Sequence, residues 1–192
     1  KSKMTLLHWA AQLNYLSLAK FLINYGAHFN ATNSLKQTPL HLAATFGHFL
    51  MTNFLITKFN ISDYVEAKTT NQQTALHLAS MNAHFNVSQI LILNGKASLN
   101  VFDNFNRTPL LYLVQSKKCT FDMYNFYISN KADIFVKDSN SLTLFYYAVA
   151  NNFTKIAIDF LSKNNQTESN YENDPIFFSD PKTNFTSFYY AS

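Results

Sequence analysis

Polar and apolar positions follow a clear pattern between residues 38 and 48, where the chain reads TPLHLAATFGH. The threonine can accept a hydrogen bond from the first free amides of a helix, and proline suits the first helical position. The two small alanines allow another helix to approach closely, and Gly47 can end the helix without a β-carbon penalty. The pattern therefore predicts a short packing helix that begins after Thr38.

The same pattern recurs along the chain. Copies begin 33 to 36 residues apart, at Thr5, Thr38, Thr74, Thr108 and Thr143. A second set of apolar residues at helical spacing follows the first copy, and it ends in the sequence NYGA at residues 24–27. The third copy has NGKA at residues 94–97 in the same place. Self-similarity at this period is typical of repeat proteins.

The TPLHLAA motif, the period and these helix ends together resemble ankyrin repeats. The resemblance covers residues 1–165 and implies an all-α solenoid of helix-turn-helix units with β-turn fingers. We expect inner helices to start near residues 5, 38, 74, 108 and 143. Residues 166–185 read as an irregular linker or insertion. Residues 186–192 echo the fifth copy, so we expect a sixth repeat to start there and the full protein to extend beyond both ends of this chain.

The polar positions between the helices predict the turns. Asn33, Asp103 and Asp138 each lie five residues before a repeat threonine, where such a side chain can bond its own turn backbone. The second repeat has extra residues between positions 60 and 68, which we expect to form a longer surface loop. In the fourth repeat, residues 117–120 delay the outer helix.

The histidines follow the repeat rather than a metal-binding pattern. His8, His41 and His77 each lie three residues after a repeat threonine, where the resemblance implies a ring that ties neighbouring repeats together. His48 and His84 lie ten residues after it. Equivalent residues of stacked repeats are about 10 Å apart, whereas a zinc site needs converging ligands. We therefore expect no metal site, and we assign to the structural motif Thr5, His8, Thr38, His41, Thr74, His77, Thr108 and Thr143.

No catalytic constellation is visible. Cys119 has Lys117 and Lys118 beside it, which could lower the pKa of its thiol, but no base accompanies it. A single cysteine favours a reducing compartment, so we expect a cytoplasmic location, either free or at the cytosolic face of a membrane protein. We expect no cofactor and no enzyme activity in this region.

Charge excludes further classes of partner. Charged residues make up 14% of the chain, and the net charge of +4 is scattered without a basic run. Nucleic-acid binding is therefore not expected. No apolar stretch of about 18 residues occurs, so this region is not expected to insert into a membrane.

In a stack of such repeats, the fingers and inner helices form a concave face. Its candidate partner-binding residues are those that the repeat pattern leaves free, namely Trp9, Leu13, Leu35, Phe46, Met81, Asn82, Phe105, Arg107 and Tyr112. Aromatic residues, Met and Arg are enriched at interaction hot spots. The sequence leaves open whether Trp9, Tyr112 and Tyr147 face the partner or pack inside the stack.

These features predict a protein-interaction module that binds a peptide or a folded partner on its concave face. One alternative is a substrate-recruiting or regulatory domain of a larger membrane enzyme, because residues 5–11 resemble the opening ankyrin repeats of DHHC-type palmitoyltransferases. Those enzymes carry in their next repeat a tryptophan for peptide capture where this chain has Leu42. A further alternative is the cytosolic ankyrin domain of a channel.

Overall fold

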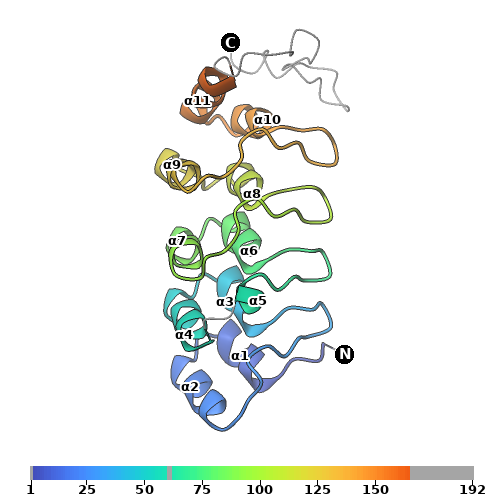
Figure 1. Ribbon diagram of the computed structural model, residues 1–192, viewed down its shortest axis with the longest axis vertical. Helices are drawn as coiled ribbons and strands as arrows, with labels where there is room; N and C mark the ends of the chain where they lie inside the picture. The colour runs from blue at the N-terminus through green and yellow to red at the C-terminus, as the bar shows by residue number, and fades with distance from the viewer. Residues whose placement is uncertain (1, 60–61, 165–192) are drawn as a thin grey trace.

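The computed structural model describes residues 2–59 and 62–164, and these residues form helices joined by turns. Five antiparallel helix pairs are stacked along one axis (Figure 1). The pairs are α1 (Leu6–Gln12) with α2 (Leu16–Asn24), α3 (Pro39–Thr45) with α4 (Phe49–Phe59), α6 (Ala75–Met81) with α7 (Phe85–Leu93), α8 (Pro109–Gln115) with α9 (Phe121–Ser129), and α10 (Leu144–Ala150) with α11 (Thr154–Asn164). The all-α prediction is confirmed.

Each inner helix begins one residue after a repeat threonine, which has an extended backbone. The hydroxyl of Thr108 accepts from the amide of Leu111 at 3.4 Å, and that of Thr143 accepts from Tyr146 at 3.4 Å. These contacts satisfy amides that have no partner inside the helix. The threonine thus fixes where the inner helix starts.

The loops that lead from one helix pair to the next project to one side as fingers (Figure 1). Backbone hydrogen bonds join consecutive fingers. The amide of Thr70 donates to the carbonyl of Leu35 at 2.9 Å, and equivalent bonds join the later fingers, Asn104 to Asn71 and Ser139 to Phe105. The fingers therefore stack in register, so equivalent residues of successive repeats lie in rows.

The predicted turn side chains are confirmed. The Asn33 carboxamide oxygen accepts from the amides of Leu35 and Gln37, both at 2.9 Å. Asp103 and Asp138 make the same pair of bonds in their own fingers. A side chain that bonds two amides of its own turn replaces the water that those amides would otherwise need.

The residue two positions before each threonine adopts a left-handed backbone although none of the five is glycine. Their φ angles range from 49° to 62°, and the residues are Lys3, Lys36, Gln72, Asn106 and Ser141. This conformation costs an L-residue roughly 1 kcal/mol. The fingers therefore carry strain that a glycine would relieve.

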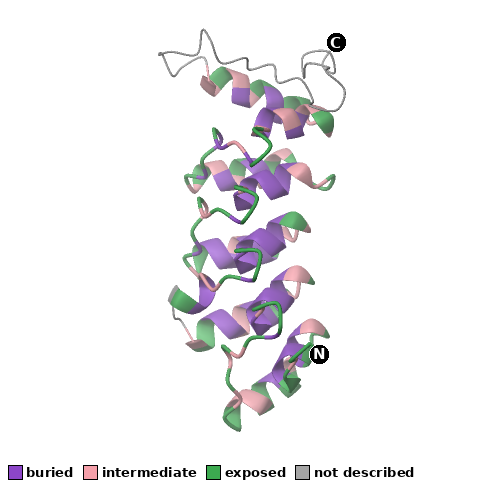
Figure 2. Ribbon diagram, turned by 90° about the vertical axis from the view of Figure 1, so that its right-hand side faces the viewer, coloured by how far each residue is buried: buried purple, intermediate pink, exposed green. Residues whose placement is uncertain are grey.

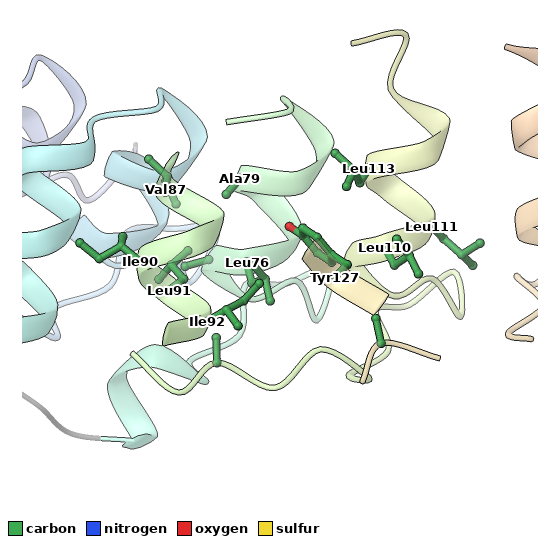
Figure 3. Close-up of a cluster of buried hydrophobic side chains, with 14 of the residues drawn as sticks. Leu76, Ala79, Val87, Ile90, Leu91, Ile92, Leu110, Leu111, Leu113 and Tyr127 are labelled. Carbon is green, nitrogen blue, oxygen red and sulfur yellow. The ribbon is translucent and has the colours of Figure 1, made fainter. Parts of the chain in front are cut away.

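The core lies between neighbouring repeats, so buried positions line the facing sides of the helix pairs (Figure 2). At the junction of the third and fourth repeats, Leu76 and Ala79 of α6 lie between Leu91 of α7 and Leu113 of α8 (Figure 3). Tyr127 of α9 is fully buried, and its hydroxyl lies 2.6 Å from that of Ser80. Each repeat thus depends on its neighbours for burial.

One prediction about a loop needs correction. The extra residues of the second repeat include a short helix, α5 (Ser62–Val65), whose Tyr64 and Val65 are buried. The ring of Tyr64 meets Phe29 edge-on at a centroid distance of 5.1 Å, and Phe29 stacks on Phe59. The insertion therefore adds an aromatic cluster to the core. The predicted linker 166–185 and the predicted sixth repeat start at 186–192 lie outside the described residues.

Candidate functional site

The repeat histidines act first within their own helices. The amide of Thr5 donates to Nδ1 of His8 at 3.2 Å, and the amides of Thr38 and Thr74 donate to His41 and His77, both at 3.1 Å. Threonine and histidine thereby form a capping box at the starts of α1, α3 and α6. Because Nδ1 accepts, the proton is assigned to Nε2.

The same rings then join successive repeats. Nε2 of His8 donates to the carbonyl of Gln37 at 2.9 Å, Nε2 of His41 donates to that of Ala67 at 3.0 Å, and Nε2 of His77 donates to that of Arg107 at 3.1 Å. His48 and His84 make comparable bonds from the starts of outer helices to the carbonyls of Gln12 and Thr45. All five histidines thus have the architectural role that their spacing indicates, whereas His28 is exposed.

Burial disfavours the protonated form of four of these rings. It lowers the pKa of His41 to about 4, against an ordinary value of 6.5, and the pKa values of His8, His77 and His84 are also lowered by burial. A neutral ring retains Nδ1 as an acceptor, which the capping box requires. The capping boxes of His8, His41 and His77 therefore need the unprotonated ring.

The described part of the chain brings together no group of three or more His, Cys, Asp or Glu side chains that could hold a metal ion. Cys119 is buried, and burial raises the pKa of its thiol to about 12. Lys117 and Lys118 are exposed and do not offset this effect. The thiol is thus protonated at neutral pH, and protonated thiols are poor nucleophiles.

Arg107 shows how a finger and its inner helix share one surface. Its guanidinium lies 5.0 Å from the ring centroid of Phe105 on the finger and 5.2 Å from that of Tyr112 on α8. It also donates to the side-chain oxygen of Gln115, at the end of α8, at 3.2 Å. In the fourth repeat the finger tip, the residue before the threonine and the end of the inner helix are therefore neighbours.

Repeat equivalence places four exposed apolar side chains on this surface, which we call the finger surface. Leu35 and Phe105 hold the same finger position, while Phe46 and Met81 lie at the ends of α3 and α6. Their exposed fractions are 54% for Leu35, 47% for Phe46 and Phe105, and 37% for Met81. Leu35 and Phe105 lie two repeats apart, about 20 Å at the usual spacing of packed helices. The finger surface thus spans three repeats.

The carboxylates of the finger surface are turned inward. Asp103 accepts from the hydroxyl of Tyr112 at 2.6 Å, and Asp138 accepts from that of Tyr147 at 2.7 Å. Both aspartates are buried, and Nε of Arg107 lies 3.9 Å from Asp138. The carboxylates are therefore engaged with the protein itself rather than presented to a partner.

Tyr112 must be removed from the predicted partner-binding set because it is 5% exposed. Besides its bond to Asp103, its hydroxyl accepts from the Gln73 side chain of the preceding finger at 2.9 Å. Burial, together with the bond to Asp103, raises the pKa of Tyr112 to about 12. Tyr147 is buried in the same way. The question left open for these tyrosines is settled in favour of packing.

The other predicted residues differ in what they offer. Arg107 is largely covered, with its side chain 19% exposed. The Asn82 side chain donates to the carbonyl of Leu78 at 2.9 Å, which ties it to its own helix. Trp9 and Leu13 are about half exposed but belong to the first repeat, at one end of the stack. The structure thus gathers only part of the predicted set.

Sequence reasoning did not find a hollow of about 530 Å³ between the outer helices α4 and α7. Its lining mixes three apolar side chains with four primary amides, and comprises Phe49, Asn53, Asn86, Gln89, Ile90, Leu93 and Asn94. Phe49 and Leu93 are 41% and 51% exposed. The signal in the sequence was two apolar residues, Phe49 at the first position of α4 and Leu93 at the last position of α7. A helix that buries only one stripe of its surface does not require an apolar residue at these positions.

Comparison with known proteins gives two matches at the level of families. A family model described as ankyrin repeats in many copies matches residues 7–56, and one described as an ankyrin repeat matches residues 71–104. No curated protein matches the chain significantly. None of the helices in the described segments is long and apolar enough to cross a membrane.

Proposed function

Because the chain belongs to the ankyrin repeat family, we propose that it is a protein-interaction module that binds its partner on the finger surface. Ankyrin repeats are generally protein-protein interaction modules, and typically they are not catalytic. The partner is a peptide or a folded protein that contacts successive fingers.

The observation that carries this proposal is the exposure of Leu35, Phe46, Met81 and Phe105 over three consecutive repeats. These side chains leave between 37% and 54% of their surface in water, which supports a role beyond packing within the fold. Large apolar and aromatic side chains held on a rigid scaffold are typical interaction anchors. A surface about 20 Å long suits a polypeptide better than a small molecule.

The backbone around these anchors is well held. Hydrogen bonds within and between the fingers fix the loop that carries Phe105, and Phe46 follows directly after α3. Anchors on ordered backbone lose little conformational freedom on binding. The finger surface is therefore preorganised for a partner.

A pull-down from native cell extract tests the proposal. The double variant Phe46→Ser, Phe105→Ser is compared with the wild type and with a matched control, Phe49→Ser, Phe135→Ser. The control phenylalanines are each 41% exposed but lie on the outer helix α4 and on the loop after α9. Circular dichroism is used to check that all three proteins are folded.

We expect the wild type and the control to retain the same partner and the finger-surface variant to lose it. Retention by the finger-surface variant, or equal loss in the control, would contradict the proposed site.

The palmitoyltransferase alternative has no support beyond the sequence. No curated protein matches the chain, and Leu42 is buried at 6% exposure. A buried leucine cannot capture a peptide as an exposed tryptophan would.

A further inference from the structure

The fingers of the second, third and fourth repeats, which border the finger surface, present cations but no free carboxylate. Each holds one cation within the seven residues before its repeat threonine, namely Lys36, Lys68 and Arg107. Lys36 and Lys68 are exposed, and Arg107 lies beside Phe105. The same stretches contain a single acidic residue, Asp103, and it is buried. The charge that these fingers offer to a ligand is therefore positive.

The inner helices of these repeats add no charge. No Lys, Arg, Asp or Glu occurs in α3, α6 or α8. The carboxylate of Glu66, at the start of the third finger, accepts from the amide of Ser98 at 2.7 Å. The remaining described carboxylates outside the fingers lie on α5, α9 and α11 or in the loop after α9, namely Asp63, Asp122, Asp133 and Asp159. An acidic ligand on the finger surface would therefore meet attraction with little repulsion.

Both ends of the finger surface pair an apolar side chain with a cation. Leu35 and Lys36 are consecutive on the finger of the second repeat. On the finger of the fourth repeat, the Arg107 guanidinium lies 5.0 Å from the ring centroid of Phe105. The two ends lie two repeats apart, about 20 Å at the usual spacing of packed helices. A matching ligand would therefore carry two carboxylates about 20 Å apart, with apolar side chains between them.

One segment of this chain meets that description. Residues 168–181, which lie outside the described residues, read ESNYENDPIFFSDP and contain four carboxylates and no cation. Asp174 and Asp180 flank an apolar run at residues 176–178, and their separation of six residues corresponds to about 20 Å of extended chain. A proline follows each aspartate, and proline favours extended backbone at the residue before it. The segment therefore matches the finger surface in charge, in apolar content and in length.

The segment is close enough along the chain to reach this surface. The last described helix, α11, ends at Asn164, ten residues before Asp174. Ten residues span up to about 35 Å, while the fourth repeat directly adjoins the fifth (Figure 1) and packed helices are about 10 Å apart. A tethered ligand also has an effective concentration of about millimolar order, so a weak contact is enough for it to occupy the surface.

We propose that residues 168–181 bind the finger surface of their own chain. Asp174 lies beside Arg107, Asp180 lies beside Lys36, and the apolar run packs on the anchors between them. This inference rests on the proposed function, because the segment and the partner use the same surface. The segment is thus an internal competitor that a partner must displace, and it weakens the capture of a partner.

Tryptophan emission tests the contact in the full 192-residue chain. Phe178→Trp places a reporter in the segment, and Trp9→Phe removes the only native tryptophan. A tryptophan in an apolar contact emits at shorter wavelength than one in water. We expect the reporter chain to emit at the shorter wavelength, and to do so equally at all protein concentrations, because the contact is within one chain.

Removing two anchors should release the segment. Phe46→Ser, Phe105→Ser is introduced into the reporter chain, and Phe49→Ser, Phe135→Ser serves as the matched control with similarly exposed phenylalanines. We expect the emission of the finger-surface variant to shift to longer wavelength and that of the control to stay unchanged. Equal emission in the reporter chain and its finger-surface variant would overturn the proposal.

The charge pairing is tested by a reversal and its rescue. Lys36→Glu should also shift the emission to longer wavelength, whereas Lys96→Glu should not, and the two lysines are matched because both are exposed with φ 56°. Adding Asp180→Lys to Lys36→Glu should restore the shorter wavelength, a result that a misfolded protein would not give. No response to Lys36→Glu, or no rescue, would overturn the pairing of Asp180 with Lys36.

The internal contact and the proposed function fail separately, because the reporter registers only the segment and the pull-down registers only a partner. An unbound segment, together with partner capture that depends on Phe46 and Phe105, would refute the internal contact and leave the proposed function intact. A bound segment with partner capture that does not depend on those residues would refute the partner site alone. Emission that changes with protein concentration would overturn the intramolecular contact, because the segment would then bind a second copy.

Discussion

Acid should destabilise this protein through its buried histidines, and His41 gives the effect a magnitude. The ring is fully buried, its Nδ1 accepts from Thr38, and burial lowers its pKa from 6.5 to about 4. In the unfolded chain the His41 ring becomes protonated below pH 6.5, whereas in the folded chain it becomes protonated only near pH 4. The contribution of the neutral His41 ring to the free energy of unfolding is therefore fully present above pH 6.5 and is lost as the pH falls toward 4.

Each unit of difference in pKa corresponds to 1.36 kcal/mol, so at pH 5, about 1.5 units below the unfolded value, His41 alone removes about 2 kcal/mol from the free energy of unfolding. The pKa values of His8, His77 and His84 are lowered in the same direction and add to the loss. A domain with an ordinary stability of roughly 5–15 kcal/mol loses a substantial share of it.

The assay compares urea unfolding of the wild type and of His41→Gln at pH 7, 6 and 5, followed by far-ultraviolet circular dichroism. Glutamine can occupy the third position of a capping box but does not titrate. The variant should be less stable at pH 7, because it loses the bonds from Nε2 to the carbonyls of Ala67 and Gln73. Its loss between pH 7 and pH 5 should be smaller than that of the wild type by about 2 kcal/mol. Equal losses in the two proteins would refute the reasoning.

Three further predictions concern other parts of the stack. Gln72→Gly should raise the free energy of unfolding by about 1 kcal/mol, because it relieves a left-handed residue with φ 61°. Asn106→Gly should raise it less, because the Asn106 side chain donates to a backbone carbonyl that the glycine cannot reach. Equal gains in stability, measured by thermal unfolding, would contradict this account. Tyr112→Phe should destabilise the fold by about 2 kcal/mol, because it leaves the buried Asp103 carboxylate without its 2.6 Å bond, yet leave partner capture unchanged; a variant as stable as the wild type in urea would exclude the role given to that hydroxyl. Cys119 should react with a thiol reagent only after unfolding, since burial raises its pKa to about 12, and rapid labelling of the folded protein would show that the thiol is accessible.

Local pattern was enough to predict the helical framework. Threonine caps, the small residues that follow them and the Asn33 or Asp103 turns act within a few residues of themselves, so the sequence shows them directly. The histidines could be assigned because their spacing follows the repeat. The all-α class was therefore within reach of the sequence.

Contacts between repeats were harder to predict. Tyr112 and Tyr147 hold the place of Trp9, yet a finger aspartate that accepts from each hydroxyl decides that both are buried. Tyr64 lies in an insertion that has no counterpart in the other repeats, so repeat equivalence gave no guide to its burial. The exposure of the finger-surface residues likewise depends on which neighbours surround them in three dimensions.

The six histidines all lie between residues 8 and 84, while Leu111 and Tyr146 take the histidine place in the last two repeats. Hydrogen bonds from histidine rings consequently stabilise the first part of the stack. Hydrogen bonds between tyrosine and aspartate stabilise the last part. Because each repeat is stabilised mainly by its nearest neighbours, the two parts need not fail together. We therefore expect acid to loosen the N-terminal repeats before the C-terminal repeats.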